Sequence, residues 1–202
     1  MIREIRKKIV LIDGPRGVGK DAVIEKIMKA NPDKFRYIQS YSTRKIRPGE
    51  KDGDTHYFIT EEEFMKKYEA GDIFEFEMFG GTYRGMSRGI VDDIIANGFV
   101  GIKTIGYLGI RSLRKYYKEK IFSVFITADK DLIRKRLEER NSPDIEGRLA
   151  EYDERHEHMN ESDHIIFNNG TLDECVTEIL ELLGIDPYAG ITLKETQHGR
   201  NA

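Results

Sequence analysis

The sequence lacks the features of a secreted, membrane-spanning or nucleic-acid-binding protein. Its 202 residues include one cysteine, Cys175, which excludes an internal disulfide framework, suits a reducing compartment and is expected to pack within a helix. The apolar run after the charged start MIREIRKK is far too short for a signal sequence or a membrane span. Lysine and arginine number 33 against 36 aspartates and glutamates, so the net charge of -3 indicates neither a nucleic-acid nor a membrane partner. We therefore expect a cytoplasmic protein with one α/β domain.

One short stretch, KIVLIDGPRGVGKDAVI at residues 8–24, combines three patterns. An apolar run, a glycine-rich turn and apolar residues at helical spacing predict a buried strand, a tight loop and an amphipathic helix. The spacing G-x-x-x-x-G-K is that of a phosphate-binding loop, whose backbone N–H groups face an anion while Lys20 adds a mobile charge. An ordinary strand-to-helix turn is the alternative. The predicted donor-phosphate residues are Gly14, Pro15, Arg16, Gly17, Val18, Gly19, Lys20 and Asp21, the last standing where Ser or Thr is expected.

Strand-like and helix-like patterns alternate along the rest of the chain. Strands are predicted at 35–40, 73–79, 99–105, 121–127 and 164–167, and helices at about 60–71, 90–97, 107–117, 129–140, 148–159 and 171–184. Asp129 is the expected cap of its helix, and the strand at 73–79 should alternate strictly, with Phe74 and Glu75 on opposite faces. This order indicates an α/β fold with a mostly parallel central sheet covered on both faces.

Two polar segments interrupt the alternation. Residues 40–54, SYSTRKIRPGEKDGD, contain Pro-Gly and Asp-Gly pairs and are expected to form an exposed loop. We expect a single domain, 1–185, made of a core (1–39, 88–138 and 161–185), an insertion (40–87) and a lid (139–160), followed by a tail (186–202). Ligands of open α/β sheets bind beyond the carboxyl ends of the strands, so both segments are positioned to close over a substrate.

Four arginines suit phosphoryl transfer, which needs positive charge aimed at the moving group. Arg44 and Arg47 lie three residues apart, so both planar groups could hold one dianionic acceptor phosphate. Arg140 and Arg148 flank the predicted lid, as residues that close on the transferred phosphate would. For these two, a solvated helix face is the alternative.

These motifs resemble those of the guanylate kinase family. GPRGVGKD is followed by SYSTRKIRPGE, DGDTHYF, FEFEMFGGTYRG, RLEER, GRL and IIFNN, over about residues 8–183. The resemblance implies a three-layer P-loop NTPase-type fold with a small mixed α/β acceptor-binding insertion and a helical lid. It also implies the reaction of GMP and ATP to GDP and ADP, with Mg²⁺.

The resemblance assigns roles to individual residues. Glu75 would read the two donors on the N1 and N2 edge of guanine, although a lone exposed strand residue is the alternative. Asn168 would lie beside the donor adenine. The implied catalytic residues are Lys20, Arg44, Arg140 and Arg148. The implied acceptor-binding residues are Ser40, Arg44, Arg47, His56, Tyr57, Glu75, Arg84 and Ser87.

Several positions depart from the family pattern. His56 and Arg84 stand where the family has tyrosines, and Met86 stands where a small hydroxyl residue helps to read guanine. The acidic D-x-D-x-Q-G motif aligns with 104–109, TIGYLG, where neither aspartate is present. Asp21 is interpreted as a ligand that partly replaces this missing acid in binding Mg²⁺. The alternative is an aspartate favoured by the helix dipole.

These departures leave other functions open. The acceptor could be another nucleotide or a sugar phosphate, as Arg84, Met86 and Gly106 suggest. A non-catalytic binding module is a third reading, disfavoured by the intact glycine spacing and by Lys20. The expected partners are small-molecule nucleotides, and the expected assembly is a monomer or homodimer.

Overall fold

The computed structural model describes residues 7–187, so expectations for residues 1–6 and for 188–202 of the tail lie outside the described residues. Its main sheet has five parallel strands in the order β2-β7-β1-β8-β9. The strands are β1 (Ile9–Asp13), β2 (Phe35–Tyr37), β7 (Val100–Thr104), β8 (Ile121–Thr127) and β9 (His164–Phe167). β1 is buried along its whole length because it has a strand on each side and helices on both faces.

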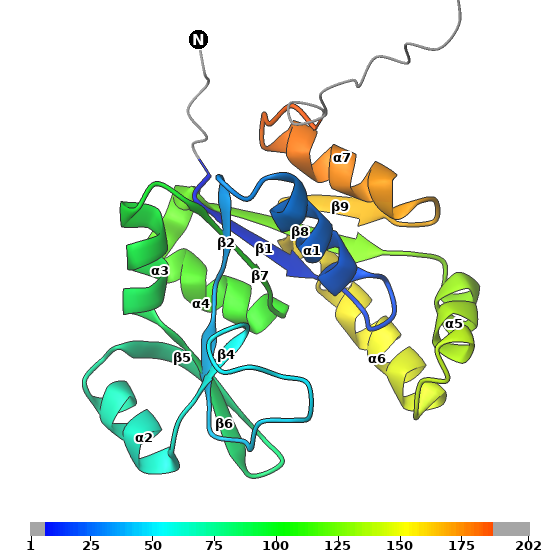
Figure 1. The fold of residues 1–202 in the computed structure, drawn as a ribbon. Helices are drawn as coiled ribbons and strands as arrows, with labels where there is room; N and C mark the ends of the chain where they lie inside the picture. The colour runs from blue at the N-terminus through cyan, green and yellow to red at the C-terminus, as the bar shows by residue number, and fades with distance from the viewer. Residues whose placement is uncertain (1–6, 188–202) are drawn as a thin grey trace, which may run out of the picture.

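Helices cover both faces of this sheet (Figure 1). α1 (Lys20–Ala30) and α7 (Leu172–Leu182) contribute Ile27 and Ile179 to a large core with β1 and β8. α3 (Arg88–Ala96) and α4 (Tyr107–Tyr117) contribute Val91 and Leu113 to a second core on the other face. The predicted three-layer α/β fold is confirmed. No helix within residues 7–187 is long and apolar enough to cross a membrane.

A second, smaller sheet is formed by residues of the predicted insertion. Its order is β4-β3-β6-β5, with β3 parallel to β4 and antiparallel to β6. The elements are β3 (Ser40–Ser42), β4 (His56–Phe58), β5 (Ile73–Phe79) and β6 (Thr82–Ser87), together with α2 (Glu61–Glu69). α2 begins with a capping box, in which Thr60 and Glu63 each bind the other's backbone N–H. The insertion is thus a mixed sheet with one helix.

The prediction for residues 35–54 is partly wrong. The single strand expected at 35–40 is divided between two sheets, because β2 pairs with β7 whereas β3 pairs with β4 and β6. Ser40 and Ser42 are buried in β3 and do not belong to an exposed loop. β4 and β6 were not predicted, since a three-residue strand and the glycine-containing run TYRGMS show no clear alternation.

β5 also departs from the strict alternation expected of it. A register irregularity lies between Ile73 and Glu75 opposite β6. The centroids of the Phe74 ring and the Tyr116 ring of α4 lie 5.1 Å apart. A Cβ added at Gly109 of α4 would lie 3.2 Å from a Glu75 carboxylate oxygen. Two consecutive side chains therefore face α4, as a β-bulge allows.

α5 (Lys130–Glu139) leads into the predicted lid. Asp129 was expected to cap this helix, but its side chain makes no capping hydrogen bond.

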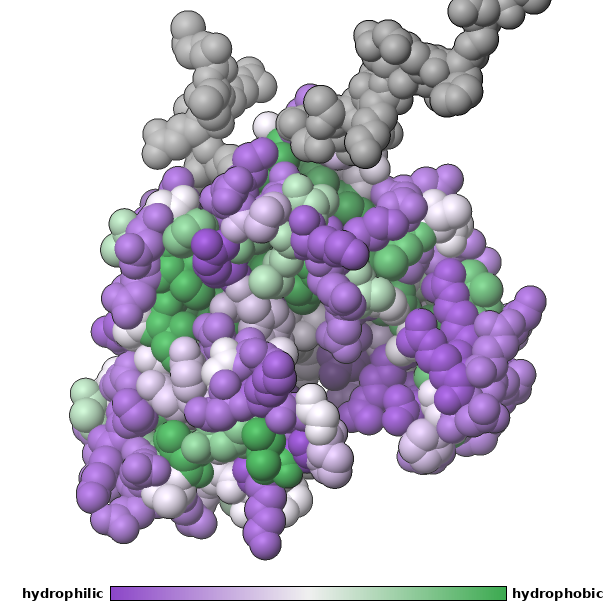
Figure 2. Space-filling model, in the orientation of Figure 1, coloured by the Kyte–Doolittle hydropathy of each residue, from purple (hydrophilic) through white to green (hydrophobic). Residues whose placement is uncertain are grey.

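The helix within the predicted lid begins earlier than expected. α6 (Ile145–Glu157) begins three residues before Arg148, because the Asp144 carboxylate accepts a hydrogen bond from Gly147 N at 3.1 Å. Figure 1 shows α5 and α6 on one side of the molecule and the small sheet on the other, and Figure 2 shows a hollow with hydrophilic walls between them.

Candidate active site

The turn between β1 and α1 has the backbone of an anion-binding loop. Gly14, Gly17 and Gly19 have φ angles of 137°, 90° and 94°, which side-chain-bearing residues rarely adopt. A Cβ added at Gly14 would stand 2.0 Å from the carbonyl oxygen of Ile126 in β8. The loop therefore lies directly against the sheet, and this close approach requires glycine.

Lys20 folds back across the loop. Its Nζ donates hydrogen bonds to the carbonyl oxygens of Gly14 and Pro15, at 2.7 Å and 2.8 Å. Burial, and after it the nearby Arg155 guanidinium, lower the pKa of Lys20 to about 8, although the Asp13 carboxylate opposes the shift. A buried ammonium of this kind is stabilised by an anion.

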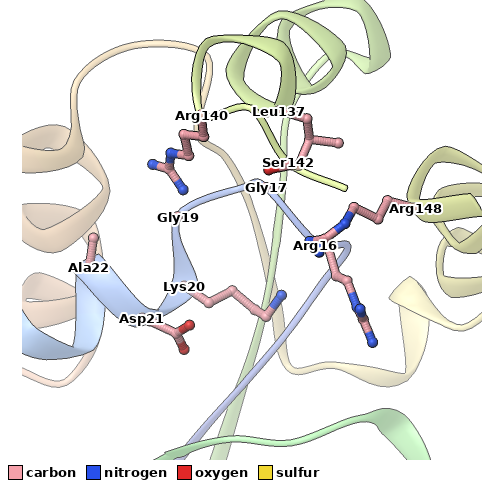
Figure 3. Close-up of a pocket in the computed structure, with 10 residues that line it drawn as sticks. All are labelled: Arg16, Gly17, Gly19, Lys20, Asp21, Ala22, Leu137, Arg140, Ser142 and Arg148. Atoms are coloured by element: carbon pink, nitrogen blue, oxygen red, sulfur yellow. The ribbon is translucent and has the colours of Figure 1, made fainter. Parts of the chain in front are cut away.

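A pocket of about 350 Å³ lies over this loop (Figure 3). Arg140 and Arg148 extend into it from the α5–α6 segment, and Asp21 lies near Lys20. The Arg148 Nε donates to the carbonyl oxygen of Pro143 at 2.8 Å. The pocket is lined by Arg16, Gly17, Gly19, Lys20, Asp21, Ala22, Leu137, Arg140, Ser142 and Arg148. The structure thus brings the two predicted lid arginines to the phosphate loop.

Two predicted ATP-site residues support the loop from behind. Val18 is fully buried in the larger core. The Asn168 Nδ2 donates to the Val18 carbonyl oxygen at 2.7 Å, and its backbone N donates to the Thr127 carbonyl oxygen at the same distance. The Asn168 Oδ1 is buried without a hydrogen-bond partner among the described residues. Asn168 therefore holds the loop and presents one unused acceptor.

Asp13 and Arg155 belong to the site but were not predicted. The Asp13 Oδ1 accepts from Gly14 N at 2.6 Å and from the Arg155 Nη1 at 2.7 Å. The same Nη1 lies 3.6 Å from where a Cβ would stand at Gly106. Arg155 follows Arg148 by seven residues and so lies on the same face of α6, a spacing from which it could have been found. This helix therefore carries two arginines to the pocket region.

Four predicted acceptor residues share one face of the small sheet. In the strand registers, Ser40 pairs with His56, and Arg84 pairs with both Ser42 and Glu77. Glu75 lies two residues before Glu77 on the same strand, and directly paired residues share a face. Ser40, His56, Glu75 and Arg84 are thereby brought together.

Charge repulsion and burial act on this face. Burial is the largest cause that lowers the pKa of His56 to about 4. The positive charges of Arg84, Lys103 and Arg44 act in the same direction. Burial also raises the pKa of Glu75, and the neighbouring Glu77 adds to this shift. Burial thus favours the neutral His56 imidazole. It also destabilises the ionised Glu75 carboxylate, which hydrogen bonds from N–H donors of a ligand would stabilise.

Tyr57 and Ser87 lie elsewhere. Alternation along β4 puts Tyr57 on the opposite face from His56, where its ring lies 5.8 Å from that of Tyr41. The Ser87 hydroxyl caps α3 by accepting from Ile90 N, and it donates to an Asp72 carboxylate oxygen. Neither side chain joins the acceptor group.

Glu50 organises the two predicted phosphate-binding arginines. Its carboxylate accepts from the Arg44 Nη1 and Nη2 at 2.7 Å and 2.6 Å, and from Arg47 N at 2.9 Å. These bonds, first that from Arg44, lower the pKa of Glu50 to about 2. The Arg44 Nε is buried without a partner in the described part of the chain. Glu50 lies within the sequence SYSTRKIRPGE, but the fold is what brings its carboxylate to the Arg44 guanidinium.

A family model and related proteins match this chain. The model described as guanylate kinase matches residues 6–184, which is most of the chain. The chain belongs to the guanylate kinase family. A guanylate kinase from Wolbachia sp. subsp. Brugia malayi (strain TRS) is 30% identical over 179 residues, covering 87% of this chain and 91% of that protein.

Two further guanylate kinases are similar to this chain. Guanylate kinase 2, chloroplastic/mitochondrial, from Oryza sativa subsp. japonica is 29% identical over 180 residues, and the match spans 87% of this chain but 63% of that protein. The crystal structure of a guanylate kinase from Anaplasma phagocytophilum has a TM-score of 0.69 at 22% identity, with 95% of this chain and 89% of that chain covered. This likeness confirms the α/β P-loop kinase fold.

The side chains present fit a magnesium ion held mainly by phosphates. No group of three or more His, Cys, Asp or Glu within residues 7–187 could hold a metal ion. Mg²⁺ commonly uses one or two carboxylates, water and substrate phosphates. Asp21 lines the pocket and has no hydrogen bond or ion pair with another described residue, so its carboxylate is available.

Proposed function

We propose that this protein transfers the γ-phosphate of ATP to a nucleoside monophosphate, with GMP as the acceptor. One observation carries this proposal. The protein has both a phosphate loop containing Lys20 and a sheet face that holds Ser40 and Glu75. Membership of the guanylate kinase family over 6–184 supports it.

On the donor side, positive groups neutralise the phosphates. The loop amides and Lys20 would bind the β- and γ-phosphates, and Arg140 and Arg148 would contact the γ-phosphate from the pocket wall. When bound, Mg²⁺ would neutralise phosphate oxygens, with Asp21 as its protein ligand directly or through water.

On the acceptor side, charge and hydrogen bonding select the nucleotide. Arg44, held by Glu50, and Arg47 would bind the acceptor phosphate. Glu75 would accept hydrogen bonds from the N1 and N2 groups of guanine, which compensate the burial that raises its pKa. An oxygen of the acceptor phosphate then forms a bond to the γ-phosphorus, while the bond from that phosphorus to the bridging oxygen breaks and ADP leaves with the electron pair.

Residues 139–160 are proposed to act as the lid. Two ion pairs tie α6 to the phosphate loop: Arg155 with Asp13, and the Arg16 Nε with a Glu151 carboxylate oxygen at 3.2 Å. Closure of this segment would exclude water, so that ATP is not hydrolysed before the acceptor binds.

The test is a coupled assay for ADP with a panel of acceptors, together with calorimetry of ATP binding. GMP turnover at least tenfold above AMP, CMP and UMP is expected. Turnover of a sugar phosphate alone would replace the acceptor assignment and keep the kinase chemistry. Absence of ATP binding would contradict both, and would favour a non-catalytic module.

A second acceptor class has structural support. Met86 is buried in the smaller core and offers no hydrogen bond to a base, and Gly106 has no side chain. A kinase of another phosphorylated small molecule is therefore the second candidate.

A further inference from the structure

Lys103 is a buried lysine that the reaction described above does not use. It lies in β7 and is 6% exposed. Its Nζ donates to the Ile38 carbonyl oxygen at 2.8 Å and lies 5.1 Å from the Tyr37 ring centroid. An ammonium has three N–H donors, and Ile38 O is its one hydrogen-bond acceptor among the described residues. A buried donor left without an acceptor is costly, so its presence calls for a reason.

The surroundings of Lys103 are those of the acceptor face. Burial, and after it the positive charge of Arg84, lower the pKa of Lys103 to about 7. The negative charges of Glu75 and Glu77 oppose this shift. Lys103 in turn contributes to the lowered pKa of His56. Ile38, whose carbonyl oxygen binds Lys103, belongs to the smaller core together with Met86, the strand partner of Glu75, so the lysine lies close to the acceptor face.

The carbonyl hydrogen bond and the contact with the Tyr37 ring use only part of the hydrogen-bonding capacity of the ammonium. One hydrogen bond to a carbonyl oxygen of the connection between β2 and β3 could be made by a neutral side chain at lower desolvation cost. A methionine of similar length would fill the same space next to Tyr37. A ligand that accepts a hydrogen bond from the Lys103 ammonium would explain why a charged group is buried here.

We propose that Lys103 determines specificity for the acceptor base by donating a hydrogen bond to an oxo group that neighbours the ring N–H read by Glu75. This inference rests on the proposed nucleoside monophosphate kinase function. It commits to a 6-oxopurine monophosphate as the acceptor class.

Lys103 offers a hydrogen-bond donor, and Glu75 offers an acceptor. A 6-oxopurine presents the complementary pair, because its O6 accepts and its N1–H donates. Adenine presents the reverse, an amino donor and a bare ring nitrogen, so Lys103 would face a donor and Glu75 an acceptor. Charge-assisted hydrogen bonds of this kind change affinity by about 10- to 100-fold. They would supply discrimination that Met86 and Gly106 cannot.

The test compares kcat/KM for GMP, IMP and AMP in the wild-type protein and in Lys103→Met. The ratio of GMP to AMP should fall by about 10- to 100-fold in the variant, and the KM for ATP should remain unchanged. Lys66→Met is the matched control, because Lys66 is exposed on α2, pairs with Glu62 and should leave every ratio unaltered.

A second variant keeps the test decisive if Lys103→Met does not fold. Lys103→Gln retains an amide donor and should lose less of the GMP preference than the methionine variant. An unchanged ratio of GMP to AMP in a folded variant, with an active wild-type protein, would overturn the role of Lys103 and leave the kinase function intact. A wild-type protein that phosphorylates no purine monophosphate would overturn the proposed function, and this inference with it.

Discussion

The Arg155 Nη1 of α6 donates to the Asp13 Oδ1 at the end of β1, at 2.7 Å. This contact joins residues 142 positions apart, and the Asp13 side chain is 4% exposed. The same guanidinium lowers the pKa of Lys20, so one arginine influences both the carboxylate and the amine of the phosphate-loop region. The position of α6 is therefore coupled electrostatically to the donor site.

Removal of Arg155 should destabilise the protein. In Arg155→Ala the buried Asp13 carboxylate keeps, within residues 7–187, only the Gly14 N–H as a hydrogen-bond partner, and the expected loss is about 2 to 4 kcal/mol. Urea denaturation measures the free energy of unfolding. The double variant Asp13→Asn/Arg155→Ala should recover part of the loss, since no buried carboxylate is then left without its arginine.

Arg134→Ala is the control for this experiment, because Arg134 pairs with Glu146 on the exposed side of the α5–α6 segment. It should change stability by less than about 1 kcal/mol. Equal stability of the two single variants would contradict the importance of the Arg155–Asp13 pair.

Glu50→Gln should weaken binding of the acceptor. The substitution removes the negative charge that holds both Arg44 terminal nitrogens, so the guanidinium loses its fixed orientation. We expect the KM for GMP to rise by about tenfold and the KM for ATP to stay the same, as for loss of one charge-assisted contact. Glu62→Gln, at an exposed ion pair of α2, is the control. A parallel rise in both KM values would argue against a specific role in acceptor binding.

ATP binding should weaken above about pH 8. The pKa of Lys20 is lowered from 10.5 to about 8, so the free protein loses this positive charge as pH rises through that value. Phosphates bind the protonated form, and affinity is therefore fully present well below pH 8 and declines as the pH rises through that value. Calorimetric titration with ATP from pH 6.5 to 9.5 measures the effect. Adenosine, which carries no phosphate, should bind with constant affinity, and a flat profile for ATP would contradict the prediction.

Asp21→Ala should have opposite effects with and without metal. With Mg²⁺ present, loss of a carboxylate ligand should raise the metal concentration needed for half-maximal ATP binding by several fold. With a chelator present, ATP should bind more tightly, because a negative charge near the phosphates has been removed. Asp33→Ala, which lies after α1 and away from the pocket, is the control. An unchanged metal dependence would leave Asp21 as a residue favoured only by the helix dipole.

Much of the main sheet was predictable because its signals are local. The apolar strands, the helical periodicity and the capping boxes at Thr60 and Thr171 each depend on residues close in sequence. The division of 35–42 between two sheets was not predictable, since it depends on which distant strands pair with each half. The bulge at Ile73–Glu75 depends on β6 in the same way.

The sequence by itself determined the phosphate loop, its glycine conformations and the family to which the chain belongs, because those features occupy contiguous residues whose backbone requirements are local. Only the tertiary structure decided which side chains meet. It separated Tyr57 from His56 by strand alternation, brought Arg155 to Asp13, and placed Lys103 against the Ile38 carbonyl oxygen. Those relationships depend on strand pairing and helix packing between distant segments, and burial then sets the charge and hydrogen-bonding capacity of each group.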